Sequence, residues 1–368
     1  SRADGIIANT AGTYGLLTVT PSFEASSDDD DYIEGNGGND VIFGGLGQDD
    51  IIGDNSDLFS LQDPNRRAPT GSDLIFGGAG LRIDRNEYIE TPGAGQTVVI
   101  SVEDRHARDS DMILGDNGRI IRIVTNAGNF DYFNYDAMDD TTTQGEHYND
   151  ANVSGYDGSR GEERIVVRVA QMLDYTPGGA DVDPSRAAGD FGKWDEIHGE
   201  SGDDAIYGQT GSDILFGDSE DDDIIGGWGH EWISGGTGQD GVIGGDGRIM
   251  TSRNIDISRE SDLSEPLYGI EQVETNKFIY TPGKIQQSTI HLAGELKKTV
   301  DLTPFVPVDA GENPSDPFAK IVDGSSNDHD IIFGGLGSDF LHGGFGSDAI
   351  SGAEALPSLV SVPGNTKV

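Results

Sequence analysis

The chain has 368 residues, of which 66 are Asp or Glu and 23 are Lys or Arg, so its formal net charge is −43. A charge of this size repels itself and opposes a compact fold unless cations bind. It also argues against nucleic acid as a partner, because phosphate binding requires a basic surface. The chain has no cysteine, which excludes disulfides and thiol catalysis. No apolar run reaches the roughly 18 residues of a membrane span, so we expect no transmembrane segment.

The first regular pattern follows a non-repeat N-terminal extension, residues 1–30. In "GNGGNDVIFGGLGQDDII", from Gly35 to Ile52, each nine-residue unit has glycine at position 1, an acid at position 6 and an aliphatic residue at position 8. Residues 31–56 are therefore predicted to form a first repeat block. The acidic run from Asp28 to Asp31 is interpreted as an exposed charge run.

The next segment, residues 57–118, is predicted to hold single repeat units separated by insertions. The units are "GSDLIF", from Gly71 to Phe76, and "DSDMIL", from Asp109 to Leu114. The insertion between them, about residues 81–108, contains "QTVVISVED", in which apolar and polar residues alternate as in a strand.

A β-rich insertion is predicted for residues 119–192. "GRIIRIVT", which begins at Gly118, alternates like a strand, whereas "GEERIVVRVAQMLDY", from Gly161 to Tyr175, fits a strand or the start of a helix. The aromatic-rich "NFDYFNY", from Asn129 to Tyr135, fits a hydrophobic cluster under a loop or a platform for stacking sugars.

The longest uninterrupted repeat block is predicted at residues 193–247. Its glycines at 199, 208, 217, 226, 235 and 244 lie nine residues apart and define five complete units. Two units depart from the pattern, because Glu231 replaces the position-6 Asp and Glu220 replaces the position-4 Gly.

The C-terminal part repeats the same organisation. Residues 248–326 are predicted to form a second β-rich insertion, with a hairpin in "STIHLAGELKKTVDL" that turns at Ala293 and Gly294. Residues 327–352 form a third repeat block, "GGLGSDFLHGGFGSDAIS" included, and residues 353–368 a non-repeat extension.

The nine-residue period predicts a short strand followed by a tight turn, repeated many times. The position-8 aliphatics of stacked units would share one thin core that no single unit could form. The position-6 acids would then lie in columns about 5 Å apart, the spacing of neighbouring strands. Such columns require hard cations between the turns, and oxygen ligands without sulfur favour Ca²⁺.

The units resemble the G-G-x-G-x-D-x-U-x nonapeptides of RTX, or haemolysin-type, calcium-binding proteins. The resemblance implies an all-β fold, a right-handed parallel β-roll that β-rich insertions interrupt, with several Ca²⁺ ions held by the position-6 Asp and by backbone carbonyls. The metal ligands that it implies here are Asp40, Asp49, Asp73, Asp111, Asp195, Asp204, Asp213, Asp222, Asp240, Asp330, Asp339 and Asp348. It also implies a secreted bacterial protein, because a roll that folds only with Ca²⁺ folds where Ca²⁺ is abundant.

The sequence shows no catalytic signature, so we expect no enzyme. "GHEWIS" around His230 has only half of a zinc-protease motif, and neither a nucleophile elbow nor a P-loop occurs. We expect a calcium-dependent structural protein of the cell exterior that assembles with its own copies into a surface layer, a filament or a large adhesin. The alternatives are an adhesin module that binds cell-surface glycan and the non-catalytic RTX region of a larger secreted enzyme or toxin.

Overall fold

The computed structural model describes residues 29–56, 69–80, 109–122, 168–175, 192–254, 295–301 and 329–353 except 345, together with six short strand segments between residues 6 and 166. All regular elements in these residues are β-strands. The part of the chain that is described therefore contains no helix able to cross a membrane. The expected all-β class is confirmed.

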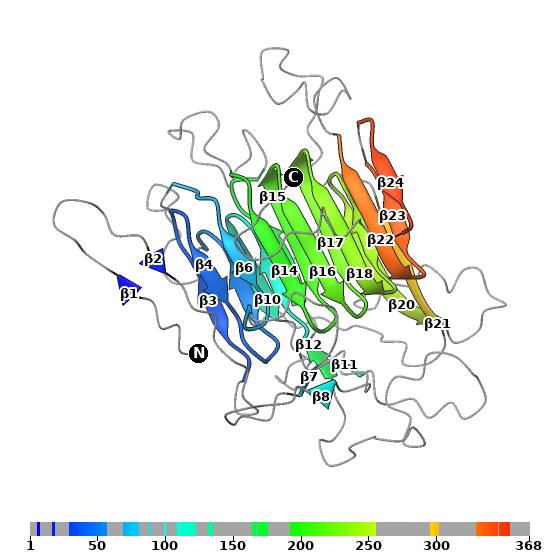
Figure 1. Ribbon diagram of the computed structural model, residues 1–368, viewed down its shortest axis with the longest axis horizontal. Coiled ribbons are helices and arrows are strands. Elements are labelled where there is room, and N and C mark those ends of the chain that lie inside the picture. Colours follow the sequence, from blue (N-terminus) through cyan, green and yellow to red (C-terminus); the bar gives the residue numbers. More distant parts are fainter. Residues whose placement is uncertain are drawn as a thin grey trace.

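Two seven-stranded parallel sheets form a β-roll (Figure 1). The β3 sheet contains, in spatial order, β23 (Phe340–His342), β19 (Gly241–Ile243), β17 (Asp223–Gly229), β15 (Ala205–Gly211), β9 (Met112–Leu114), β5 (Asp50–Ile52) and β3 (Tyr32–Glu34). The β4 sheet contains β24 (Ala349–Ser351), β22 (Ile331–Gly337), β18 (Trp232–Gly238), β16 (Ile214–Ser219), β14 (Glu196–Glu200), β6 (Leu74–Phe76) and β4 (Val41–Phe43). The chain alternates between the sheets at every strand, so each coil of the roll contains two nine-residue units.

The position-8 residues of both sheets form one continuous core. Successive units place this residue on alternate sheets, and on each sheet its side chain points toward the other sheet. Neighbouring side chains of a strand lie on opposite faces, so positions 7 and 9 point outward. The buried members are Ile42, Ile51, Ile75, Ile113, Ile197, Ile206, Leu215, Ile224, Ile233, Val242 and Ile332. At the two ends Ile33 and Leu341 are only partly buried. The core is thus one aliphatic layer thick, as the period predicted.

The insertions interrupt turns and leave the strand register intact. The isolated units around Leu74 and Met112 take their places as β6 and β9, between neighbours from the continuous blocks. We call the turns from the β3 sheet to the β4 sheet the first edge, and the opposite turns the second edge. Three interruptions, after β5, β9 and β19, fall on the first edge, and the one after β6 falls on the second.

Two antiparallel hairpins from these interruptions pack on the outer face of the β3 sheet. One pairs β10 (Gly118–Arg122) with β13 (Arg168–Met172), and the other pairs β20 (Arg248–Asn254) with β21 (Glu295–Asp301). The ambiguous segment 161–175 is therefore a strand, formed by β12 (Arg164–Val166) and β13. The strand β21 pairs with β20, and the first half of the hairpin expected at 288–302 lies outside the described residues.

The remaining short strands belong to the insertions at residues 81–108 and 119–192 and to the N-terminal extension. Three antiparallel pairs occur: β1 (Ile6–Ile7) with β2 (Leu17–Thr18), β7 (Tyr88–Ile89) with β8 (Val99–Ile100), and β11 (Tyr132–Asn134) with β12. The aromatic segment 129–135 thus contributes a strand, and its side chains lie outside the described residues.

Both hairpins dock through an isoleucine at the point where the chain leaves the roll. Ile120 packs with Ile52 and Leu114, and Ile249 packs with Ile225 and Ile243. These partners are position-9 residues, which point outward from the β3 sheet. Both isoleucines end a Gly-Arg-Ile sequence, Gly118–Ile120 in one insertion and Gly247–Ile249 in the other, so the same short sequence performs the same packing role in the two insertions.

Each hairpin also inserts a buried basic side chain against an outward-facing position-7 acid. Lys298 on β21 is 3% exposed, and its Nζ donates to Asp223 Oδ1 at 2.6 Å and to the carbonyls of Asp221 and Asp222 at 3.0 and 2.9 Å. In the other hairpin Arg168 Nε lies 2.7 Å from Asp50 Oδ1. A buried charge requires such a partner, so these ion pairs fix where the hairpins sit.

The outer face of the β4 sheet carries a row of stacked rings. The row contains Phe43, Phe76, His198, Phe216, Trp232 and Phe333, with neighbouring centroids 4.3–5.6 Å apart. Burial lowers the pKa of His198, but hydrogen bonds to Asp218 and Glu196 outweigh it and raise the pKa to about 9. The imidazole is therefore a buried cation within an aromatic row.

Replacing the buried lysine should release the second hairpin. Lys298→Met removes the buried ammonium group that contacts Asp223 and two carbonyls, and we expect a loss of about 3–5 kcal/mol in the free energy of unfolding at saturating Ca²⁺. Chemical denaturation followed by circular dichroism measures it. Lys193→Met, at an exposed lysine, is the control and should change little; equal stabilities of the two variants would contradict the docking role.

Candidate metal centre

The position-6 acids form two columns, one along each edge of the roll. The first-edge column contains Asp40, Asp73, Asp195, Asp213, Glu231, Asp330 and Asp348, and the second-edge column contains Asp31, Asp49, Asp111, Asp204, Asp222, Asp240 and Asp339. All twelve aspartates expected from the sequence are present in these columns. Nine of them are buried, and the exceptions, Asp40, Asp339 and Asp348, belong to coils at the ends of the roll.

One carboxylate oxygen of most of these acids holds the column together. Oδ1 accepts the backbone N–H of the position-6 residue on the preceding coil, as from Asp195 to Asp213 at 2.9 Å and from Asp204 to Asp222 at 3.0 Å. The same bond spans insertions, since Asp73 N–H donates to Asp195 Oδ1 at 2.7 Å across 122 positions of sequence. These hydrogen bonds between successive coils therefore fix one oxygen of each accepting carboxylate, independently of any bound ion.

The second oxygen, Oδ2, is buried and has no hydrogen-bond partner within the described residues. This holds for Asp40, Asp49, Asp73, Asp111, Asp195, Asp204, Asp213, Asp222, Asp240 and Asp330. Each Oδ2 lies beside the position-1 glycine of its own unit, together with a main-chain carbonyl of the next coil. A Cβ at Gly208 would lie 2.6 Å from Asp213 Oδ2 and 2.7 Å from the carbonyl of Gly226. Buried oxygens converge there without a donor, and such groups are costly unless a cation compensates them.

The electrostatics of the columns agree with this cost. Burial raises the pKa of Asp49, Asp73 and Asp213 to about 7. For Asp111 burial is again the largest cause, and repulsion from Asp49 and Asp204 on the adjacent coils adds to it. The stacked carboxylates thus resist ionisation unless a positive charge is near.

The donor set fits Ca²⁺. The described residues contain no group of three or more His, Cys, Asp or Glu side chains arranged for a metal, so a site must combine carboxylates with main-chain carbonyls. All of these donors are oxygens, which suits a hard cation that accepts carbonyl ligands and irregular geometry. Bound Ca²⁺ would supply the charge that lets the carboxylates ionise. The residues that would hold it are the position-6 aspartates, and this assignment stays a prediction.

The structure adds one position-6 residue that the sequence interpretation missed. Asp31 lies in the acidic run interpreted as exposed charge, yet its N–H donates to Asp49 Oδ1 at 2.6 Å. It therefore begins the second-edge column. The signal was present, because "DYIEG" from Asp31 to Gly35 has an acid, an aliphatic residue and a glycine in the repeat phase, although the preceding residues lack the glycines of a complete unit.

The two departures from the consensus keep their places in the fold. Gly226 faces the Cγ of Glu231, where other position-1 glycines face an aspartate Oδ2, so the longer side chain carries its carboxylate past that point. Glu220 adopts φ 78° at a position that normally has glycine. Non-glycine residues enter this left-handed region only at a cost.

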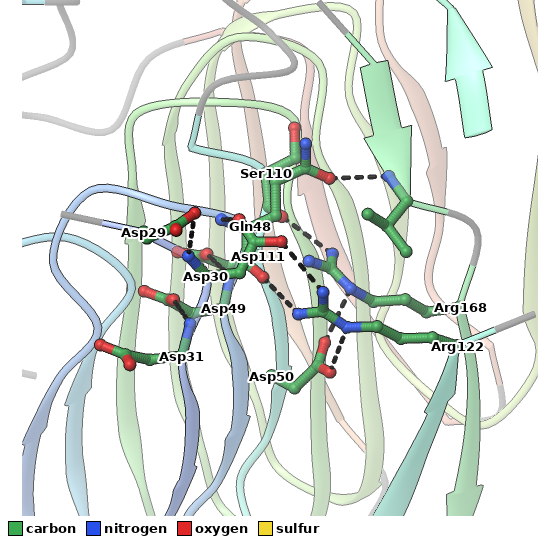
Figure 2. A network of polar contacts seen from close by, with 11 residues as sticks. Asp29, Asp30, Asp31, Gln48, Asp49, Asp50, Ser110, Asp111, Arg122 and Arg168 are labelled. Atoms are coloured by element: carbon green, nitrogen blue, oxygen red, sulfur yellow. Dashed lines mark hydrogen bonds and ion pairs between the residues drawn. The ribbon is translucent and has the colours of Figure 1, made fainter. Parts of the chain in front are cut away.

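Basic side chains from a hairpin approach the second-edge column (Figure 2). Figure 2 shows Arg122 and Arg168 meeting at Asp50, beside Asp49 and Asp111. Arg168 lowers the pKa of Asp49, against the larger effect of burial. The hairpin therefore supplies part of the positive charge that this end of the column needs.

Comparison with known proteins agrees with this description. The chain matches the family of RTX calcium-binding nonapeptide repeats, in four copies, over residues 26–57, 192–224 and 325–354. The chain therefore contains RTX calcium-binding nonapeptide repeats, and these repeats lie in the β-roll. Searches of curated proteins and of solved structures find no match. The units at β6 and β9 lie outside the matched residues but complete the same roll.

Protonation of the column aspartates should partly replace Ca²⁺ in stabilising the roll. The metal-free roll has aspartates with a pKa above their ordinary value of 3.8, so its stability is highest when they are protonated and falls as the pH rises through about 7. In chelator we expect the β signal in circular dichroism to decrease as the pH rises from about 4 to about 7. With Ca²⁺ the signal should persist, because ions bind the ionised form. A chelated protein that gains β signal over this range would contradict the argument.

Filling the space beside a position-1 glycine should damage a turn. Gly208→Ala places a methyl group against Asp213 Oδ2 and the Gly226 carbonyl, and overpacking of this kind costs about 1–3 kcal/mol. We expect a higher Ca²⁺ midpoint for folding. Gly352→Ala is the matched control, since nothing lies within 4 Å of the added carbon. Identical midpoints for the two variants would contradict a crowded oxygen site at Gly208.

Proposed function

We propose that this protein is a non-catalytic, calcium-dependent structural component of the cell exterior that assembles end to end with its own copies. The observation that carries the proposal is the last coil. Ile350 is a position-8 residue, equivalent to the fully buried core members, yet it is 48% exposed, and Leu336 in the adjacent turn is 60% exposed. The roll therefore ends in an accessible surface. Apolar side chains and the two edge strands β23 and β24 form this surface.

Edge strands of this kind favour pairing with further strands. A copy that docks on the last coil would extend both sheets and bury Ile350. A head-to-tail contact is heterologous, so repetition gives an open filament unless the rotation closes a ring. Filaments of this kind that also pack side by side would form a surface layer or a large adhesin.

The histidines support a role other than catalysis. His198 has both ring nitrogens near carboxylates, 3.1 Å from Asp218 and 3.4 Å from Glu196, and its pKa of about 9 keeps it protonated at neutral pH. It cannot accept a proton as a general base there. His230 packs against His329 in neighbouring coils. An extracellular location is part of the proposal, because abundant Ca²⁺ would drive folding there.

Light scattering and circular dichroism during a Ca²⁺ titration test this proposal. We expect β signal and molecular mass to rise together, and Ile350→Asp to abolish the rise in mass while it retains the β signal. Trp194→Asp, at a residue 53% exposed in the middle of the roll, is the control and should still assemble. A folded wild type that stays monomeric at high Ca²⁺ and high protein concentration would refute the assembly.

A further inference from the structure

The first-edge turn after β9 contains a buried carboxylate that the nonapeptide pattern does not explain. Asp116 is at position 2 of its unit, where the repeat usually has glycine, and it is 1% exposed. Its Oδ2 accepts hydrogen bonds from Thr210 N–H at 3.0 Å and from Thr210 Oγ1 at 2.9 Å. Its Oδ1 is buried and has no hydrogen-bond partner within the described residues. A fixed, buried and half-satisfied carboxylate needs a positive partner.

The neighbours of Asp116 belong to the position-6 column. A Cβ on Gly115, the preceding residue, would lie 2.7 Å from Asp195 Oδ2 and 2.7 Å from the carbonyl of Gly208. Asp195 is 0% exposed, and its Oδ2 likewise has no hydrogen-bond partner. Two partnerless carboxylate oxygens and a main-chain carbonyl therefore gather around one turn.

The charges at this turn agree with the geometry. Burial raises the pKa of Asp195, and Asp116 is the strongest of the charges that raise it further. Burial also raises the pKa of Asp116, with repulsion from Asp213 and Asp54. On the second edge Arg168 and Lys298 offset part of such repulsion at Asp49 and Asp240. At Asp116 the charge interactions are with other acids.

The position of this turn in the chain gives it a special role. Asp116 precedes the insertion between β9 and β14, and Asp195 follows it, so 79 residues of sequence separate two side chains of one turn. Buried aspartates also follow β5 and β19 at the other first-edge exits, as Asp54 and Asp246. At the first of these, Asp54 Oδ1 accepts the N–H of Gly71 from the returning chain at 3.1 Å. An exit aspartate thus contacts the chain that returns from the insertion.

We propose that Asp116, Asp195 and the Gly208 carbonyl together hold one Ca²⁺ ion, with Asp116 as a ligand additional to those of a repeat site, and that this ion joins the two ends of the insertion 119–192 across the first edge. The site differs from the repeat sites that have glycine at position 2 because a position-2 carboxylate adds a second negative charge. More carboxylate charge in a preorganised site increases Ca²⁺ affinity. This turn therefore fills at lower Ca²⁺ than turns with a single carboxylate, and its ion fixes the insertion to the roll.

Calcium binding to the full chain, measured by equilibrium dialysis and calorimetry, tests the site. We expect Asp116→Asn to lose one ion, or to bind one ion at least about tenfold more weakly, with an unchanged circular dichroism spectrum at saturating Ca²⁺. Asparagine still accepts the Thr210 hydrogen bonds, so a purely structural role would leave the binding curve unchanged. An unchanged curve overturns the proposal.

Asp109→Asn is the matched control. Asp109 is a buried acid that precedes β9, whereas Asp116 follows it, and the Asp109 oxygens accept hydrogen bonds from Gly47 N–H at 3.0 Å and from Ser201 Oγ at 2.8 Å. We expect it to keep the full number of ions. A loss of one ion in both variants would assign the effect to general damage and overturn the proposal.

Two further results separate this inference from the calcium-binding roll on which it rests. If Asp116→Asn does not reach the wild-type spectrum, Asp116→Glu decides. It keeps the charge but moves it by one methylene, so we expect a folded roll with one weakened step, and a wild-type curve refutes the site. A wild type that binds no Ca²⁺ would instead refute calcium binding by the roll as a whole.

Discussion

The repulsion between carboxylates stacked on successive coils is the constraint on which this structure depends. Most position-6 aspartates accept a backbone hydrogen bond at Oδ1, and ten of them have a buried Oδ2 beside a glycine. Strand spacing sets the distance between these charges at about 5 Å, and the fold cannot increase it. The roll must therefore obtain positive charge from ions, protons or its own basic side chains.

The three sources are distributed unevenly over the molecule. Arg168 and Lys298 arrive from insertion hairpins and lie against the β3 sheet near the second edge. The first edge instead receives further acids at the points where insertions leave. Since the insertions emerge mainly at this edge and fold back over the β3 sheet, the same segments that interrupt one column of turns partly neutralise the other. Insertion and roll are thus electrostatically coupled.

The apolar part of the fold is thin by comparison. One layer of position-8 aliphatics and the flanking contacts of Ile120 and Ile249 supply the described core. A core of this shape grows only along the roll axis, so each added coil buries the previous one. The exposed Ile350 follows directly from that geometry, because the last coil has no successor within the described chain.

The sequence by itself determined the repeat, the alternation of strand and turn, the core positions and twelve of the column aspartates, because each depends on spacing within nine residues. It did not reveal Asp31, whose unit lacks the usual glycines, or that segment 161–175 forms strands, since its pattern fits two periods. Only the tertiary structure decided that Asp195 returns beside Gly115, the residue before Asp116, and that Lys298 contacts Asp223. The first pair is separated by a whole insertion and the second joins an insertion to the roll, and no local pattern encodes how an insertion packs against the coil it left.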